Sequence, residues 1–179
     1  MSDSEKKKDC GCNKKKTKIR QLTEEELKKQ STPVNKMTMV KSFASAIVSR
    51  GMTNKKTTEP IKRLRVLSCL GNEHLDGELP PCQHLQQSKT EGKYFCGGCG
   101  CGDSARTWLL AESDEYSKLD YPNLNCPLKM PGFSNYSASE AHEAEEPVTR
   151  KYYIENMSFT DIEKVPVTTH ENPPEPKKE

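Results

Sequence analysis

The sequence predicts a small metal-stapled α+β domain of the zinc-ribbon-like type, with short strands and loops, one N-terminal amphipathic helix and disordered tails. Only 32% of the 179 residues are hydrophobic and 30% are charged. Much of the chain therefore lacks the apolar surface needed to offset its conformational entropy. Eight cysteines are present, and three of them crowd into KYFCGGCGCGD at 93–103. A small ordered region of this composition needs cross-links for stability, supplied either by a bound metal ion or by disulfides.

Whether the cysteines bind a metal or form disulfides depends on the redox state of the cellular compartment. The opening stretch MSDSEKKKDCGC has no apolar run typical of a secretory signal. No stretch approaches the roughly 18 apolar residues of a transmembrane helix. We therefore expect a cytoplasmic protein without a membrane partner. In a reducing compartment, the cysteines are interpreted as metal ligands before disulfides.

Charge is unevenly distributed along the chain. Residues 1–66 carry 18 Lys and Arg against 7 Asp and Glu, a net +11, whereas residues 67–179 carry 10 against 19, a net −9. The basic N-terminal half suits nucleic acid, an acidic protein surface or the acidic half of another copy. A solvated basic tail is the simpler interpretation.

Four regions follow from composition and pattern. Residues 1–31 are predicted to be a disordered basic tail, and 32–51 an amphipathic helix. Residues 60–136 form the cysteine-rich metal-binding domain. Residues 137–179 are expected to be an acidic and Pro-rich tail with a strand near 150–159, or a partner-binding segment there.

The helix is expected over 33–50, with Thr32 as its cap, Pro33 at its first position and Gly51 at its end. Its expected apolar face comprises residues at helical spacing: Val34, Met37, Val40, Phe43, Ala44, Ile47 and Val48. This face is expected to pack on the protein's own domain or on a partner.

Shorter elements are expected elsewhere. Thr23 and Glu26 fit a capping box for one or two helical turns. IKRLRVLSC at 61–69 alternates enough for a strand that leads into Cys69, and 106–112 is a second candidate strand. Residues 93–101 are expected to be a tight turn between short strands.

Six cysteines are the candidate metal ligands. Cys96 and Cys99 form a C-x-x-C on a Gly-rich turn, where two thiolates converge on one Zn²⁺ and glycines permit positive φ. A second pair completes the tetrahedron, either Cys69 with Cys82 or Cys82 with His84. Cys101 and Cys126 then bind a second metal, share a binuclear site or simply pack in the core. The candidate set is Cys69, Cys82, Cys96, Cys99, Cys101 and Cys126, with His74 and His84 as rivals.

The sequence is also compatible with alternatives to zinc. Cys96, Cys99, Cys101 and Cys126 make the four thiolates of a [4Fe–4S] cluster, and a Cys-Pro also closes bacterial ferredoxin motifs. The spacing from Cys99 to Cys101 is shorter than in those motifs. A redox disulfide is disfavoured because the glycines oppose a helix at the motif. Cys10 and Cys12 in the basic tail are a flexible CGC or a supplementary thiolate pair.

The order of an amphipathic helix, RLRVLSC, CGGCGC and CPLKMPGF resembles short cysteine-rich proteins encoded by tailed bacteriophages, including marine ones. The resemblance covers residues 34–136 and implies that five cysteines occupy the family's positions: Cys69, Cys96, Cys99, Cys101 and Cys126. Two features depart from its pattern. Asn72 stands where the first C-x-x-C would end, with Cys82 ten residues later, and Phe133 replaces a Trp after the final Cys-Pro. The resemblance implies a metal-bound module, virion-associated if phage-encoded.

The expected function is a non-enzymatic zinc-binding structural or interaction module that docks to a larger protein assembly. The alternatives are a [4Fe–4S] protein with an electron-transfer or structural role, and a nucleic-acid-binding zinc module that uses the basic half. The sequence contains no Gly-rich phosphate loop, G-x-S-x-G or H-E-x-x-H motif. No acid, base and nucleophile can be assembled, so an enzyme is the least favoured class.

Overall fold

The computed structural model describes residues 17–30, 36–53, 55–112, 116–140 and 147–168. Cys10, Cys12 and the two chain ends expected to be disordered, 1–16 and 169–179, lie outside these residues. The described part is a small α+β fold with five α-helices and two two-stranded sheets. No helix within it combines the length and apolarity needed to cross a membrane.

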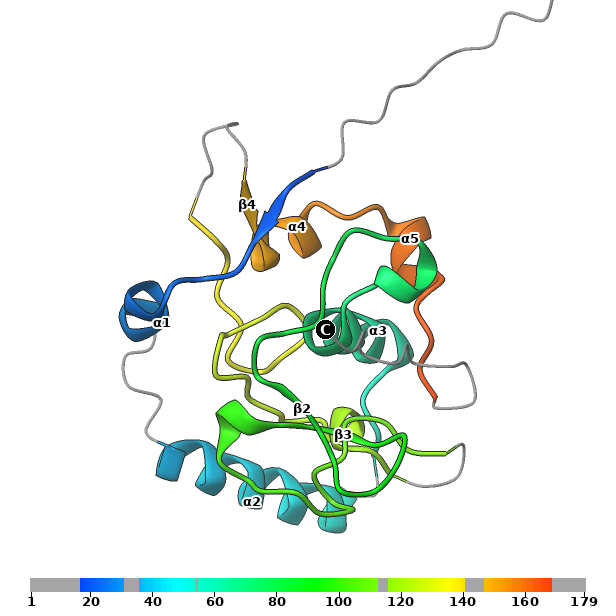
Figure 1. Cartoon of the computed structure of the whole chain (residues 1–179). Helices are drawn as coiled ribbons and strands as arrows, with labels where there is room; N and C mark the ends of the chain where they lie inside the picture. Colours follow the sequence, from blue (N-terminus) through cyan, green and yellow to red (C-terminus); the bar gives the residue numbers. More distant parts are fainter. Residues whose placement is uncertain (1–16, 31–35, 54, 113–115, 141–146, 169–179) are drawn as a thin grey trace, which may run out of the picture.

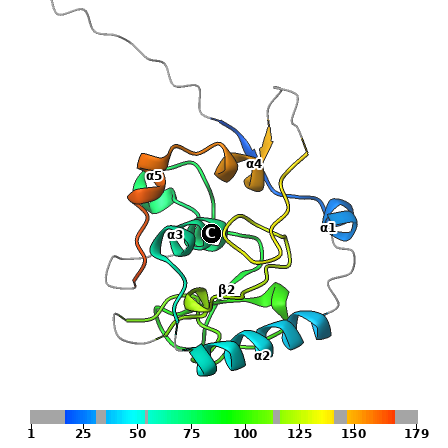
Figure 2. The same cartoon turned by 180° about the vertical axis from the view of Figure 1, so that it is seen from behind.

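Helix α3 (Glu59–Leu70) lies at the centre of the fold (Figure 1). Helices α4 (Arg150–Glu155) and α5 (Phe159–Glu163) lie on one side of it, and helix α2 (Lys36–Thr53) lies beyond a layer of loops on the other. The view from behind shows the same order (Figure 2). The hairpin over 85–96 and the turn that follows it lie between α3 and α2 (Figure 1).

The prediction of a strand over 61–69 is wrong, because this segment forms most of α3. Pro60 occupies the first turn, where its missing N–H is not needed. From Arg65 to Leu70 all but one residue is buried, polar side chains included. A helix buried nearly all round shows no clear 3.6-residue pattern, and its partial alternation resembles that of a strand.

The predicted helix over 33–50 is present as α2, but it ends later and buries a different face. Residues 31–35 lie outside the described part. Gly51 does not end the helix, which continues to Thr53. The side chains buried against the protein are Met39, Phe43 and Ala46. Most of the expected apolar face is exposed instead, because apolar residues occupy more than one side of the helix.

The Gly-rich cysteine segment is built on a hairpin. Strand β2 (Leu85–Gln87) pairs antiparallel with β3 (Tyr94–Cys96), with Leu85 opposite Cys96. The 3₁₀ turn η2 (Gly97–Cys99) follows β3 directly. The strand expected over 106–112 is reduced to an isolated bridge between Phe95 and Trp108. The remaining 3₁₀ turns are η1 (Glu73–Leu75) and η3 (Lys118–Asp120).

Residues 17–30, which belong to the expected disordered tail, carry a strand and a helix. Strand β1 (Ile19–Arg20) pairs in parallel with β4 (Val148–Thr149). Helix α1 (Glu24–Gln30) follows, and its predicted capping box is confirmed. Thr23 N donates to Glu26 Oε2 at 3.0 Å, and Glu26 N donates back to Thr23 Oγ1 at 3.3 Å.

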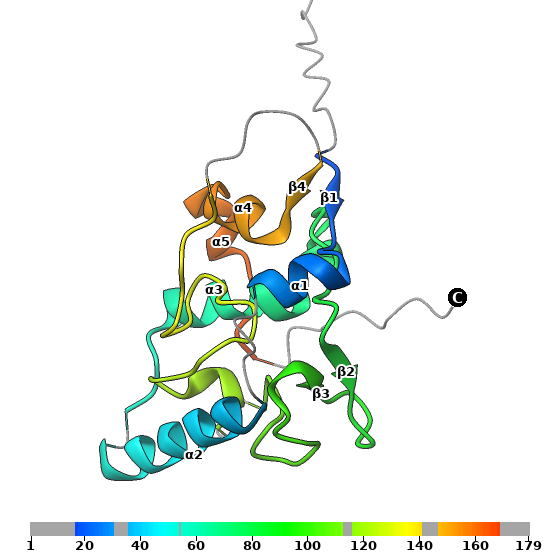
Figure 3. The same ribbon diagram turned by 90° about the vertical axis from the view of Figure 1, so that its left-hand side faces the viewer.

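The strand expected near 150–159 is wrong, because two short helices form there. Thr149 caps α4 by accepting from Tyr152 N, and Ser158 caps α5 by accepting from Asp161 N. Both helices pack on α3, as the side view shows (Figure 3). The described residues 147–168 are thus part of the folded domain, since Ile154 and Val165 enter its core.

Arg65 of α3 holds together the loop that follows η3. Its side chain is 1% exposed. Its guanidinium donates to four backbone carbonyls, at 2.7 to 3.1 Å: those of Leu119, Tyr121, Pro122 and Gly132. Burial lowers the pKa of Arg65 to about 10, against the opposing charges of Cys69 and Asp120. One side chain thereby fixes both ends of a loop that has little secondary structure of its own.

We predict that Arg65→Met destabilises the protein by about 3 kcal/mol or more, because two buried and two part-buried hydrogen bonds to backbone carbonyls are lost. The change should appear as a lower urea midpoint in equilibrium unfolding. Arg106→Met, at an exposed position, is the matched control and should stay within about 0.5 kcal/mol of the parent. Equal midpoints for the two variants would contradict the role given to Arg65.

Candidate metal centre

The C-x-x-C motif forms a compact turn stabilised through sulfur. Strand β3 delivers Cys96, and η2 carries the chain to Cys99. Cys99 Sγ donates to Cys96 O at 3.1 Å, and Cys101 N donates to Cys99 Sγ at 3.3 Å. Gly100 has φ +68°, a conformation that side chains disfavour. Backbone N–H groups aimed at sulfur are what a metal-bound thiolate needs from its surroundings.

The two glycines between Cys96 and Cys99 lie close to side chains of the hairpin and of the residue before it. A Cβ on Gly97 would lie 2.6 Å from the side chain of Gln86, and a Cβ on Gly98 would lie 2.8 Å from the ring of His84. Both neighbours precede or belong to β2, and Gly97 N donates to His84 O at 2.8 Å. The CGGC sequence is therefore explained by its contact with the hairpin.

Lys118 is buried against this turn. Its side chain is 3% exposed, and its Nζ donates to Cys99 Sγ at 2.9 Å. The same ammonium lies 4.7 Å from the centre of the Phe43 ring. A capping box between Ser117 and Asp120 fixes the turn that presents it. A buried ammonium is costly unless a negative charge is close, and sulfur is the partner that it has here.

Cys96, Cys99 and Cys101 form the first trio of cysteines. The contacts described above determine the direction in which the pKa of each one is shifted. Hydrogen bonds with Cys101 and Cys96, together with Lys118, hold the pKa of Cys99 well below its ordinary value, although burial opposes them. The hydrogen bond with Cys99, then burial, raises the pKa of Cys96 and likewise that of Cys101. Burial lowers the pKa of Lys118, but the charges of Cys99 and Cys101 outweigh it and the pKa is raised overall. Of Cys96, Cys99 and Cys101, Cys99 is the one whose ionisation these contacts favour.

A second trio lies beside α3 and consists of Cys69, Cys82 and Cys126. Cys82 N donates to Cys69 O at 2.9 Å, so the two backbones are in direct contact although they are thirteen residues apart. Burial, then the charges of Cys126 and Cys82, raises the pKa of Cys69 well above its ordinary value. Burial also raises the pKa of Cys126 to about 11.

The loop that returns Cys82 to Cys69 is closed by Asn72. Its Oδ1 accepts from Leu79 N at 2.8 Å, and Leu79 O accepts from Asn72 N at 2.9 Å. Gly71 has φ +73°, and a Cβ there would lie 2.2 Å from Leu79 O. Asn72 thus has a structural role, because it closes the loop that ends with Cys82 beside Cys69.

Cys126 is held by a side chain that pairs with its backbone. Cys126 N donates to Asn135 Oδ1, and Asn135 Nδ2 donates to Cys126 O, both at 2.8 Å. This double contact closes the loop 126–135 and orients the cysteine within the core.

Arg150 is the cation of the second trio. It donates to Leu67 O at 3.1 Å and also to Pro80 O. Burial lowers the pKa of Arg150, opposed by the charges of Cys82, Cys69 and Cys126. The charge of Cys69 in turn contributes to the raised pKa of Cys96. The two trios are therefore close enough for their charges to interact.

His74 and His84 are the two histidines that could replace a cysteine ligand. The ring of His84 lies against Gly98, and burial lowers its pKa while the charge of Cys99 opposes this. His84 is therefore placed beside the C-x-x-C turn. The backbone of His74 belongs to η1, but its side chain lies outside the described part.

All six predicted cysteines are free thiols, and the structure gathers them in two neighbouring trios. Within the described residues, no three His, Cys, Asp or Glu side chains are arranged so that they could hold a metal ion as they stand. Sequence reasoning missed Lys118 and Arg150. The S-x-x-D pattern of the capping box at 117–120 was the one available signal for the first, and none marked the second.

No family model matches the sequence, and comparisons with curated proteins and with solved structures find no significant match.

We predict that Lys118→Met raises the pKa of Cys99 in the metal-free protein, because it removes the ammonium that contacts Cys99 Sγ. Without the ammonium, the pKa of Cys99 should move toward or above the ordinary thiol value of about 8.5. The measurement is the ultraviolet thiolate absorbance against pH, on reduced and metal-free protein. Lys55→Met, at an exposed position, is the control and should leave the titration unchanged. An identical titration in both variants would rule out the ion pair.

Proposed function

We propose that this chain is a non-enzymatic zinc-binding structural and interaction module. The observation that carries the proposal is the buried contact of Lys118 Nζ with Cys99 Sγ, within a group of six free thiols. A buried ammonium beside clustered thiols is stabilised when those thiols become thiolates, and Zn²⁺ binding converts them. Thiolate-only ligation is typical of closed structural zinc sites.

The donor set fits zinc in chemistry and in charge. Zn²⁺ held by four thiolates has a net charge of −2, and six thiolates that share two Zn²⁺ have the same charge. Lys118 and Arg150 supply two positive charges next to the two trios. Cys69, Cys82, Cys96 and Cys99 would hold one ion. Cys101 and Cys126 would either extend the centre to a second ion or pack beside it.

A [4Fe–4S] cluster is the alternative cofactor, since it also takes four thiolates. The set suggested for it combines Cys96, Cys99 and Cys101 with Cys126. In the structure, Cys126 is instead grouped with Cys69 and Cys82 through their charges. The iron–sulfur assignment would draw three ligands from one trio and one from the other, whereas the zinc assignment draws two from each.

Nucleic-acid binding has less support. Several basic side chains of residues 1–66 are engaged within the protein. Arg65 is buried, Arg20 pairs with Glu26 at 2.8 Å, and Lys62 pairs with Asp120 at 2.7 Å. The net charge of this half therefore overstates the free positive surface that phosphates would meet.

A protein assembly is the partner that we propose for the module. Large apolar side chains are exposed on several elements, including Phe159 on α5 and Tyr136 in the loop before β4. Such residues are common in protein–protein contacts. The resemblance to cysteine-rich proteins of tailed phages is the ground for proposing a phage-type assembly.

Metal analysis after anaerobic purification tests the proposal. We expect a colourless protein that retains about one or two zinc ions per chain. Cys69→Ser and Cys96→Ser should lose most of the zinc, because each removes a ligand. The double variant Cys10→Ser/Cys12→Ser is the matched control and should retain it. A brown protein with about four iron atoms per chain would contradict the zinc assignment.

A further inference from the structure

The stretch that ends at Cys82 approaches the end of helix α3 with few backbone donors of its own. Pro80 and Pro81 lack a backbone N–H. The link to α3 is made by Cys82 N, which donates to Cys69 O at 2.9 Å. The oxygen of Pro80 lies close to the end of α3 as well, because a Cβ on Gly71 would be 2.6 Å from it. A backbone carbonyl held in such a packed position needs a donor.

Arg150 supplies the donor that this stretch lacks. Its guanidinium donates to Pro80 O and, at 3.1 Å, to Leu67 O. Each of these carbonyls belongs to the residue two positions before a cysteine, Cys82 and Cys69 respectively. One planar side chain thus ties the two backbones together just ahead of both cysteines.

The position of Arg150 within its own helix gives a separate indication. Arg150 and Lys151 open α4, and the first turn of this helix contains no acidic residue. Positively charged side chains at a helix N-terminus are disfavoured by the helix dipole. The local stability of α4 therefore does not call for an arginine at this position, whereas the contact with the two carbonyls does.

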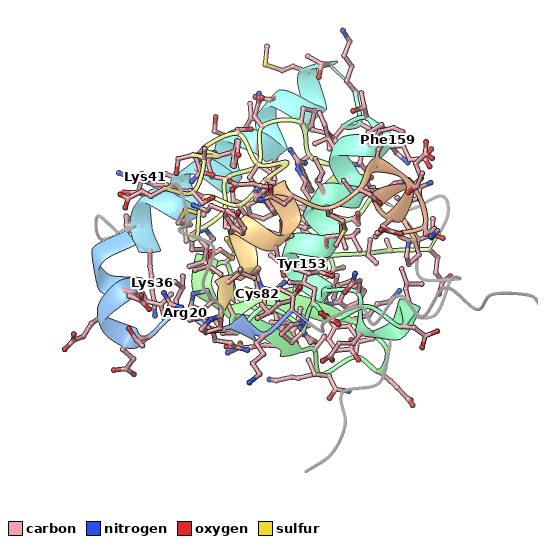
Figure 4. All side chains as sticks on the ribbon, turned by 90° about the horizontal axis from the view of Figure 1, so that it is seen from above. Arg20, Lys36, Lys41, Cys82, Tyr153 and Phe159 are labelled. Atoms are coloured by element: carbon pink, nitrogen blue, oxygen red, sulfur yellow. The ribbon has the colours of Figure 1, made fainter. Side chains whose placement is uncertain are left out.

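Contacts on either side of Arg150 hold α4 in place over the loop. Strand β4 pairs with β1 directly before the helix. Further along α4, the side chain of Ile154 is 2% exposed and packs in the core. Seen from above, Cys82 lies between Arg20 of β1 and Tyr153 of α4 (Figure 4). The arginine is therefore brought to the cysteine loop by an element that is anchored at both ends.

From these observations we infer that Arg150 is a positioning residue of the proposed zinc centre, which holds Cys69 and Cys82 together as a ligand pair and so couples the segment 147–168 to the metal. The inference rests on the proposed function, since the two cysteines are ligands of that same centre. Side chains that orient metal ligands typically change metal affinity by about 10- to 100-fold when they are replaced. We therefore expect Arg150 to set how long zinc is retained rather than whether it binds.

Zinc release to a chelator, from the full chain purified without oxygen, tests the role of Arg150. Arg150→Met should release zinc about tenfold faster or more, because Cys69 and Cys82 lose the side chain that ties their backbones together. Arg150→Lys keeps the charge but not the planar fork, and it should also release zinc faster than the parent. Recovery of the parent's rate by lysine would overturn the positioning role, because charge alone would then suffice.

Arg63→Met is the matched control. Arg63 lies on α3 and also joins it to the segment 147–168, by donating to Glu163 O and Val165 O. Neither carbonyl lies near a cysteine in the sequence, so this variant loosens the same segment without freeing the backbones of the ligand pair. It should release zinc at the parent's rate, and a release as fast as that of Arg150→Met would overturn the inference.

The cobalt-substituted protein gives a readout that a general loss of stability does not move. The absorbance bands between thiolate and Co²⁺ depend on how the sulfurs are arranged around the metal. Arg150→Met should alter these bands, whereas Arg63→Met should leave them as in the parent. Identical spectra for the three proteins would overturn the inference. If Arg150→Met does not fold, Arg150→Lys is compared with Arg63→Met in its place.

Amide hydrogen exchange tests the coupling from the side of α4, because a coupling between two sites is reciprocal. Zinc should slow exchange within α4 of the parent, and it should slow exchange less in Arg150→Met. A parent that binds no zinc would contradict the proposed function and, with it, this inference. A parent that binds zinc but whose α4 exchanges at the same rate with and without the metal would overturn this inference alone.

Discussion

The four hydrogen bonds of the Arg65 guanidinium are the interaction on which the rest of the structure depends. They connect the central helix to Leu119, Tyr121, Pro122 and Gly132, in a segment with almost no regular secondary structure. The segment packs Leu119, Tyr121 and Phe133 into the core, and the backbone carbonyls that are buried with them need donors. A single planar donor with several N–H groups satisfies carbonyls that would otherwise be buried without partners. The same contacts set the position of Lys118, one residue before the first of them.

Once Lys118 is fixed, its charge determines what the thiols can do. It contacts Cys99 within the first trio, and Arg150 interacts with the charges of the second. Lys118, which is buried, and Arg150, which is partly buried, would together offset the −2 charge of a zinc–thiolate centre. The fold and the proposed metal thus depend on each other, because the residues that order the loops also supply the compensating charges.

Local sequence predicted local structure where the signal is itself local. The capping box of Thr23 and the Gly-rich turn after Cys96 needed only neighbouring residues, and both formed. The segment 61–69 did not follow its alternation, because a helix buried on nearly all sides loses the periodicity by which helices are identified. The burial of Lys118 and Arg150 was beyond prediction for a related reason. In the sequence they are ordinary surface residues, and only tertiary packing brings each of them to the cysteines.

X-ray absorption at the zinc edge, on protein purified without oxygen and freed of excess metal, tests the central claim most directly. The claim is that the cations Lys118 and Arg150 balance a thiolate-only zinc centre. The account predicts bound zinc with a first shell made of sulfur alone, at about 2.3 Å. A shell dominated by nitrogen or oxygen at about 2.0–2.1 Å, or protein that keeps no zinc after the excess is removed, would contradict it.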